Sequence, residues 1–295
     1  MACTSPQRRA LLRSRTAPAV LVAAALGWAV PTIAAGDPKA EGSRPGDAAG
    51  YAQAFAALER ADVETLSKAL DALVVDPALV EPFQARDRAR LLAAAQPVFE
   101  RLKAEKNITH LYFLEPEPSR ICFLRVHAPA IFGDVVKRDT FSQAIATHQV
   151  GSGKELGKTA FALRVVKPIR VAGNVVGYME LGEEIDHFLE RMKAQTGDDY
   201  ALLVDKKRVD RKELARVRGE DRWNERPDLV LIDSTIWNER TVKLPVHFTK
   251  LPDAGREVPS WTDGSQRYAG VAFPVRNAAG EIVGAMFVRH PVDAR

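Results

Sequence analysis

The chain has 295 residues, 46% of them hydrophobic and 27% charged, which is enough for two modest domains that each bury a core. Its formal net charge of +4 is a feature shared with nucleic-acid-binding proteins. However, the first 35 residues hold four arginines and no acid, so the rest of the chain is neutral. The positive charge therefore belongs to the N-terminal segment and does not indicate nucleic-acid binding.

The N-terminus has the layout of an export signal. Four arginines within 8–15 precede fourteen mostly apolar residues, 17–30, and small residues then lead to Ala34-Ala35. This apolar run is shorter than the ~20 residues that span a bilayer. We therefore expect residues 1–35 to be a signal peptide for export to the periplasm, by the general or the twin-arginine route, with an uncleaved membrane anchor as the alternative.

The two cysteines, Cys3 and Cys122, limit the redox and metal chemistry. Cys3 lies in the predicted signal peptide, so the mature chain is expected to hold one thiol and no internal disulfide. The sequence contains no CxxC or CxxCH motif, which argues against a structural zinc site and against covalent c-type haem.

Two long helices are predicted after a linker. Residues 36–50 are rich in glycine, alanine, proline and charge, which is typical of disorder. Helical periodicity follows over 51–75 and 86–106 within an N-terminal helical region, 51–106. The first helix carries an apolar stripe of Phe55, Leu58, Val63, Leu66, Leu70 and Leu73.

The remainder of the chain predicts an α+β fold with antiparallel strands. In a first module, 107–208, strands are expected at 109–115, 120–127, 161–169, 175–181 and 200–205. Helices are expected there at 140–148, capped by Asp139, and at 183–193. A charged connector, 209–228, leads to a second module, 229–295, with strands at 229–233, 242–248 (broken at Pro245), 267–275 and 281–289.

One hairpin occurs twice. Pro168-Ile169-Arg170 and Val175-Val176-Gly177 return as Pro274-Val275-Arg276 and Ile282-Val283-Gly284, with one residue inserted in the second turn. The copies are too far apart for a solenoid. The repeat therefore predicts two PAS-like modules of ordinary domain size, each closing with the same hairpin.

The segment 151–159 resembles a phosphate-binding loop but does not match one. Its Gly-Lys-Thr, 157–159, requires a glycine at position 152, where the residue is serine. A phosphate-binding loop must also open a helix, and here a strand follows. We interpret this segment as a flexible loop.

Strand alternation separates the side chains of the first module into two faces. The apolar face is expected to lie under the two long helices and includes Leu111, Phe113, Cys122, Leu124, Val126, Phe161, Leu163, Val165, Val175, Met179 and Leu181. The other face is expected to gather His110, Tyr112, Arg125, His127, Arg164, Tyr178 and Glu180. Two guanidinium groups beside tyrosine and histidine suit a small carboxylate or another anion.

The loop 128–140 is expected to fold over this face and close a pocket, with Asp134 pairing with Arg125 or with an amine on a ligand. The main alternative is a solvated face with an Arg164–Glu180 cross-strand pair. Metal binding by His127, Asp134 and His148 is disfavoured by their spacing. Non-covalent haem held by His127 or His110 is a further alternative.

An enzyme is disfavoured by the pattern of nucleophiles. No serine lies in a nucleophile-elbow setting, and Cys122 falls on the predicted core face, where thiols are inert. No catalytic residue is therefore predicted.

The arrangement resembles the double Cache family of extracytoplasmic sensor regions over about residues 50–295. It is similar to the subgroup described as the double sensory domain of two-component sensor kinases. The resemblance is carried by Leu124-Arg-Val-His-Ala-Pro129, Gly133-Asp134, Arg138, Gly153 to Gly157, Leu163-Arg-Val-Val-Lys-Pro-Ile169 and Gly177-Tyr-Met-Glu-Leu-Gly182.

The resemblance implies a periplasmic sensor whose main ligand pocket lies in the first module. Its pocket candidates are Arg125, His127, Asp134, Arg138 and Tyr178. The aromatic-rich motif of amino-acid-binding members is not found here. Relatives continue into a membrane helix, whereas this chain ends, so we expect a free component that reports to a membrane sensor kinase or chemoreceptor. A structural module with a vestigial pocket, dimerising through helix 51–75, is the remaining alternative.

Overall fold

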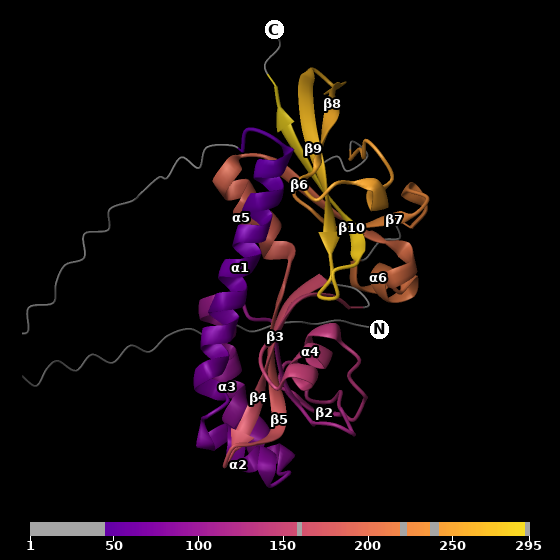
Figure 1. The fold of residues 1–295 in the computed structure, drawn as a ribbon. Coiled ribbons are helices and arrows are strands. Elements are labelled where there is room, and N and C mark those ends of the chain that lie inside the picture. Colours follow the sequence, from indigo (N-terminus) through magenta and orange to yellow (C-terminus); the bar gives the residue numbers. More distant parts are fainter. Residues whose placement is uncertain (1–44, 158–160, 219–222, 237–241, 293–295) are drawn as a thin grey trace, which may run out of the picture. The chain divides into compact units, whose positions relative to one another are not determined.

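Two five-stranded antiparallel sheets form the body of the structure, a computed structural model that describes residues 45–157, 161–218, 223–236 and 242–292 (Figure 1). The predicted signal peptide, 1–35, and residues 36–44 of the predicted linker lie outside the described residues. Helices precede the two sheets in the chain, so the α+β class is confirmed.

Three helices open the described chain, and an aspartate caps each of them. Their bounds are α1 (Ala48–Leu73), α2 (Pro77–Gln84) and α3 (Arg88–Lys106). Asp47, Asp76 and Asp87 accept hydrogen bonds from backbone N–H groups in the first turns. Helix α1 begins before the predicted residue 51 because Asp47 can cap at that point, so residues 48–50 are not linker.

The first sheet has the strand order β2-β1-β5-β4-β3. Its strands are β1 (His110–Leu114), β2 (Cys122–Arg125), β3 (Gly151–Leu156), β4 (Phe161–Val171) and β5 (Asn174–Glu184), with α4 (Asp139–Thr147) between β2 and β3. The segment predicted as a flexible loop is therefore mostly the edge strand β3. Asp139 does not cap α4; instead Glu155 of β3 accepts from the Thr140 N–H at 2.7 Å.

The second sheet repeats this topology with the order β7-β6-β10-β9-β8. Its strands are β6 (Asp199–Asp205), β7 (Leu229–Ser234), β8 (Arg256–Asp263), β9 (Gln266–Arg276) and β10 (Ile282–Pro291). Each strand has the same place in this sheet as its counterpart in the first sheet, with β6 corresponding to β1 and β10 to β5. The structure therefore supports a duplicated module beyond the repeated hairpin.

The second half differs from the sequence expectations in four respects. The predicted end of the first module at residue 208 is too late, because β6 pairs with β10 and β7 of the second sheet. Residues 242–247 form no strand and lead into a single 3₁₀ turn, Phe248–Lys250. Strand β8 was not foreseen, and the predicted connector contains helix α6 (Arg211–Arg218).

Helix α1 packs against both sheets along its apolar stripe (Figure 1). Phe55 lies between Phe188 of α5 (Asp186–Thr196) and Phe273 of β9, with ring centroids 6.0 and 5.8 Å away. Leu66 and Leu70 are buried in the same core. A homodimer through α1 would therefore have to use another face of the helix. None of the helices in the described ranges combines the length and apolar character needed to cross a bilayer.

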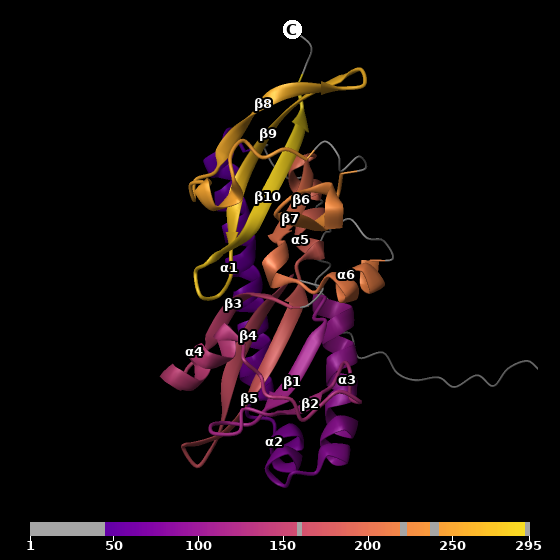
Figure 2. The same ribbon diagram turned by 90° about the vertical axis from the view of Figure 1, so that its right-hand side faces the viewer.

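A direct contact joins the two modules where the β9–β10 turn meets β3 and α4 (Figure 2). The Ala278 N–H donates to the Lys154 carbonyl at 2.8 Å, and the Gln143 amide donates to the Ala278 carbonyl at 2.9 Å. Gly153 lies opposite with φ +145°, and a Cβ added there would stand 2.8 Å from the Ala278 Cβ. Only glycine permits this close approach.

Gly177 and Gly284, the equivalent glycines of the two hairpin copies, each allow a close approach that a side chain would block. A Cβ at Gly177 would lie 2.3 Å from the Phe83 ring, and a Cβ at Gly284 would lie 2.0 Å from the Leu203 carbonyl oxygen. Both glycines stand beside a register shift in their sheets. The repeat is therefore partly a steric requirement of the fold.

Replacing Gly284 by alanine is expected to destabilise the second module, because the new methyl group meets a backbone carbonyl that cannot rotate away. Overpacking of this kind costs ~1–3 kcal/mol. Urea unfolding of Gly284→Ala would measure the loss. Gly46→Ala is the control, since a Cβ there has no neighbour within 4 Å. Equal unfolding midpoints for both variants would contradict the steric account.

Candidate functional site

The ring of Tyr112 is the centre of a cationic cluster on the first sheet. Its centroid lies 5.5 Å from the Arg125 guanidinium, 4.6 Å from that of Arg138 and 5.5 Å from that of Arg164. Tyr112 is buried, with 5% of its surface exposed. Cations over an aromatic face are attracted by its quadrupole, so the ring holds three like charges near one another.

Sheet register explains why these groups meet. Tyr112 pairs directly with Arg125 of β2 on one side and with Glu180 of β5 on the other. Arg164 of β4 lies opposite Gly182, two residues beyond Glu180 on the same face. Arg138 reaches the cluster from the residue preceding α4. Four neighbouring strands and a loop thus contribute to one surface.

Glu180 joins two of the three guanidinium groups. Its side chain is fully buried, with Oε1 2.6 Å from Arg164 Nη1 and Oε2 2.9 Å from Arg138 Nη2. Burial would lower the pKa of Arg164, but the Glu180 carboxylate and the Tyr112 hydroxyl raise it. The predicted Arg164–Glu180 pair is thus present, but it is buried and is not part of a solvated face.

Arg125 anchors the loop 128–138 to the sheet. Its two terminal nitrogens each lie 2.7 Å from an Asp134 carboxylate oxygen, and Nη1 also donates to the Ile131 carbonyl at 2.8 Å. The hydrogen bonds from Arg125 hold the pKa of Asp134 below its usual range. The Arg125 side chain is 13% exposed. The Gly133 N–H donates to the Cys122 carbonyl and the Cys122 N–H donates to the Asp134 carbonyl, so this part of the loop runs along the edge of β2. Closure of a pocket over the sheet face stays a prediction.

His110 and His127 pack edge-to-face beside Tyr112, with their ring centroids 4.7 Å apart. The Leu111 N–H donates to His127 Nδ1, and the Thr109 hydroxyl lies 2.7 Å from His110 Nδ1. Burial, together with the Arg164 charge, lowers the pKa of His110 to about 2 and that of His127 to about 4. Both rings are neutral at pH 7, and a haem on either one would have to displace these contacts.

Tyr178 shares a buried group with Tyr112, but its ring contact is with a helix residue and not with the three guanidinium groups. It packs against Phe141 of α4 at 5.3 Å, in a buried group that also contains Cys122. Burial raises the pKa of both Tyr178 and Cys122, the latter to about 11, which makes the thiol inert.

Two of the predicted apolar-face residues stand on the opposite face. Cys122 pairs with Leu114 while Leu124 pairs with Phe113, so Phe123 is an extra residue that reverses the alternation. Val175 is displaced in the same way, because Ile169 pairs with Gly177 and Arg170 with Val175.

Two supporting residues were missed by the sequence analysis. Arg88 donates to the carbonyls of Phe123 and Pro129 and stacks 3.7 Å above the Phe132 ring, which holds the loop from the helical side. Glu155 caps α4, as described above. Sequence periodicity does not reveal the role of either residue. Arg88 is the first residue of α3, and Glu155 lies in the stretch interpreted as a loop.

Several buried polar atoms of the cluster make no hydrogen bond among the described residues. They are Arg138 Nε and Nη2, Arg164 Nε and Glu180 Oε2. The Arg138–Glu180 pair is close enough for charge attraction but is not aligned as a hydrogen bond. Unsatisfied buried polar groups are rare in folded proteins and mark places where a ligand or water binds. Three of these four atoms are donors, which favours an acceptor.

The charge of the cluster is also suited to an anion. Three guanidinium groups face the two carboxylates of Asp134 and Glu180, and both histidines are neutral. One positive charge is left over. In the described ranges no group of three histidine, cysteine or acidic side chains is placed to hold a metal.

Comparison with known proteins identifies a matching family. The family model described as "Double sensory domain of two-component sensor kinase" matches residues 48–222. No curated protein sequence matches the chain. Similar solved structures include the periplasmic domain of Vibrio cholerae LuxQ, with 10% identity over 83% of this chain and 98% of that one, at a TM-score of 0.47.

Two further structures show the same level of similarity. The Campylobacter jejuni chemoreceptor Tlp3 ligand-binding domain in complex with L-valine has 11% identity over 84% of this chain and 91% of that one, at a TM-score of 0.45. The V. cholerae histidine kinase DctB sensor domain has 13% identity over 83% of this chain and 100% of that one, at a TM-score of 0.43. Similarity this low leaves the ligand to be argued from the residues of this chain.

Replacing Glu180 by glutamine is expected to lower the free energy of unfolding by ~3–5 kcal/mol, because buried Arg164 and half-buried Arg138 lose their shared counter-charge. The control is Glu81→Gln, which removes an exposed pair with Arg90 at 3.5 Å and should change stability by ~0–1 kcal/mol. Urea unfolding at pH 7 measures both. A Glu180 variant as stable as the control would mean that the pair is not buried in solution.

Lowering the pH from 6.5 to 4.5 is expected to destabilise the fold, because the unfolded chain binds protons that buried His127 excludes. The pKa of His127 falls from 6.5 to about 4 on folding, so its contribution is complete above pH 6.5 and is lost as the pH falls toward 4. The loss by pH 4.5 is on the order of 2 kcal/mol.

His127→Gln should therefore show a shallower decline of stability with falling pH than the wild type. His148→Asn is the control, because His148 is exposed and its φ of 52° is one that asparagine tolerates. Urea unfolding across this pH range gives the slopes. Parallel slopes for the wild type and His127→Gln would contradict the assignment.

Proposed function

We propose that this chain, which belongs to the double sensory domain family of two-component sensor kinases, is an extracytoplasmic sensor that binds a small carboxylate or another anion in its first module. The family membership covers residues 48–222 and supports a sensory, non-catalytic role. The ligand class is argued from the guanidinium cluster around Tyr112.

One observation carries the proposal: Arg138 and Arg164 hold buried donor nitrogens without hydrogen-bond partners, beside a cluster with one excess positive charge. A planar carboxylate accepts two parallel hydrogen bonds from a guanidinium. Glu180 Oε2, which is ion-paired with Arg138 but makes no hydrogen bond, would accept one from a hydroxyl or amino group on the same ligand. A solvated sheet face, the main alternative, does not account for these buried groups.

The ligand would act on the second module through α4. Arg138 immediately precedes this helix, and Gln143 within it donates to Ala278 of the β9–β10 turn. An anion that draws Arg138 away from Glu180 would change the position of α4 and therefore that contact. A ligand shifts such an equilibrium only by its differential affinity for the two states. A membrane sensor kinase or chemoreceptor is the proposed receiver of the signal.

The ligand class can be tested with small anions at matched ionic strength. Acetate, lactate, succinate, citrate, sulfate and phosphate are added to the purified protein, and thermal unfolding is followed. An anion at one hundred times its Kd adds ~2.7 kcal/mol of stability. We expect at least one organic acid to stabilise the wild type, and Arg138→Gln to lose that effect.

The matched control is Arg276→Gln, which removes an exposed arginine of the second module paired with Asp253 at 2.8 Å. It should keep the response of the wild type. Circular dichroism establishes that each variant is folded before titration. Stabilisation that survives in Arg138→Gln, or that is lost equally in Arg276→Gln, would refute a specific site at the Tyr112 cluster.

A further inference from the structure

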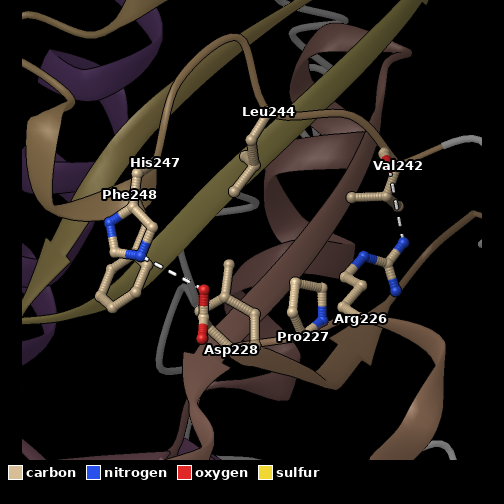
Figure 3. Close-up of a pocket in the computed structure, with 8 residues that line it drawn as sticks. Arg226, Pro227, Asp228, Val242, Leu244, His247 and Phe248 are labelled. Atoms are coloured by element: carbon tan, nitrogen blue, oxygen red, sulfur yellow. Dashed lines mark hydrogen bonds and ion pairs between the residues drawn. The ribbon is translucent and has the colours of Figure 1, made fainter.

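A pocket of about 240 Å³ lies in the second module, between the start of β7 and the segment 242–248 (Figure 3). It lies outside the residues that match the family model, 48–222. It is also separate from the Tyr112 cluster, since none of its lining residues belongs to the first sheet. The first-module proposal therefore does not account for it.

The lining of this pocket is mainly apolar. Leu229, Val242 and Phe248 are buried, with 6%, 7% and 4% of their surfaces exposed, and half-buried Leu244 also lines the pocket. These side chains belong to one hydrophobic cluster that also contains Phe287. A concave apolar surface with a few polar groups is the usual composition of a small-molecule site.

The polar groups of the pocket give it an acidic character at one end. His247 Nε2 lies 3.4 Å from the Asp228 carboxylate (Figure 3). The Thr249 N–H donates to His247 Nδ1, and the Thr249 hydroxyl lies 2.9 Å from the same nitrogen, so Nε2 is the ring nitrogen that faces Asp228. No lysine or arginine of the described residues forms an ion pair with the Asp228 carboxylate, whose partner is His247. The Asp228 side chain is 56% exposed, so it is open to a ligand.

Arg226 stands at the other end and is turned toward protein groups. Its guanidinium points at the Val242 carbonyl, 3.5 Å away (Figure 3). The same guanidinium lies 3.8 Å from the Glu225 carboxylate. The charge that the pocket offers to a guest is therefore negative. This is opposite in sign to the first-module cluster.

We propose that this pocket is a second ligand site, which binds a small apolar molecule carrying one amino group. The ammonium group would bind the Asp228 carboxylate beside His247, and the hydrocarbon part would cover Leu244 and Phe248. The volume is below the ~300–1,000 Å³ of sites for drug-sized ligands, so the guest is small.

Three probes with the same six-carbon chain test the proposal: hexylamine, hexan-1-ol and hexanoate. Each is titrated into the full chain at pH 7 and followed by ligand-observed NMR. We expect hexylamine to bind most tightly and hexanoate least. Asp228→Asn should weaken hexylamine binding about tenfold, which corresponds to ~1.4 kcal/mol, and leave hexan-1-ol unchanged.

Leu244→Trp should block hexylamine and hexan-1-ol alike by filling the pocket. If that variant does not fold, Leu244→Ala should weaken both probes equally, because each loses the same apolar contact. Glu81→Gln, which removes an exposed acid elsewhere, should bind hexylamine as the wild type does. Arg138→Gln should also leave hexylamine binding unchanged, which separates this site from the first-module site.

Three results would overturn the inference. The first is the absence of saturable binding of hexylamine to the wild type. The second is hexylamine binding that is unaffected by Asp228→Asn, which would indicate adsorption to the surface. The third is tighter binding of hexanoate than of hexylamine, which would assign the site to Arg226.

Discussion

The buried carboxylate of Glu180 is the interaction on which the first module depends. A charge with no exposure is tolerated only when counter-charges surround it, and here Arg164 and Arg138 supply them. Arg164 comes from the neighbouring strand β4 and Arg138 from the residue before α4. One carboxylate thus ties together two strands and the helix that covers them. Arg138 and Arg164 still have buried N–H groups without a hydrogen-bond acceptor among the described residues. Glu180 thus positions the two arginines but does not satisfy all of their donors.

The two modules share a topology and differ in the polarity of the equivalent surface. In the repeated hairpin, Phe287 stands where the first module has Glu180, and Gly270 stands where it has Arg164. In the first module, Arg164 of β4 pairs with Gly182 of β5. In the second module the two residue types are exchanged, because Gly270 of β9 pairs with Arg289 of β10. Phe287 joins the apolar cluster beside the second pocket. A duplicated scaffold has therefore acquired one cationic and one largely apolar surface.

Much of this fold follows from local pattern. The long helices, the paired strands and the repeated hairpin are visible because apolar periodicity and turn residues act over short distances. The meeting of Tyr112, Arg125, Arg164 and Glu180 on one face also follows from alternation, and the structure brings them together. Their role in ligand binding stays a prediction. The assignment of β6 to the second sheet was not accessible, because strand partners are chosen by tertiary packing.

The failures are equally specific. Gly151 and Gly153 led to a loop interpretation, yet these glycines serve a close contact with α4 and with Ala278 along an edge strand. Cys122 and Val175 were placed on the wrong face because one extra residue in each strand reverses the alternation. No local pattern reveals such a bulge. The bulge at Phe123 also has an evolutionary meaning: losing or gaining a single codon there would exchange which side chains the sheet presents. Deleting that one residue would turn Cys122 to the helix-covered side of the sheet and remove its thiol from the group around Tyr178.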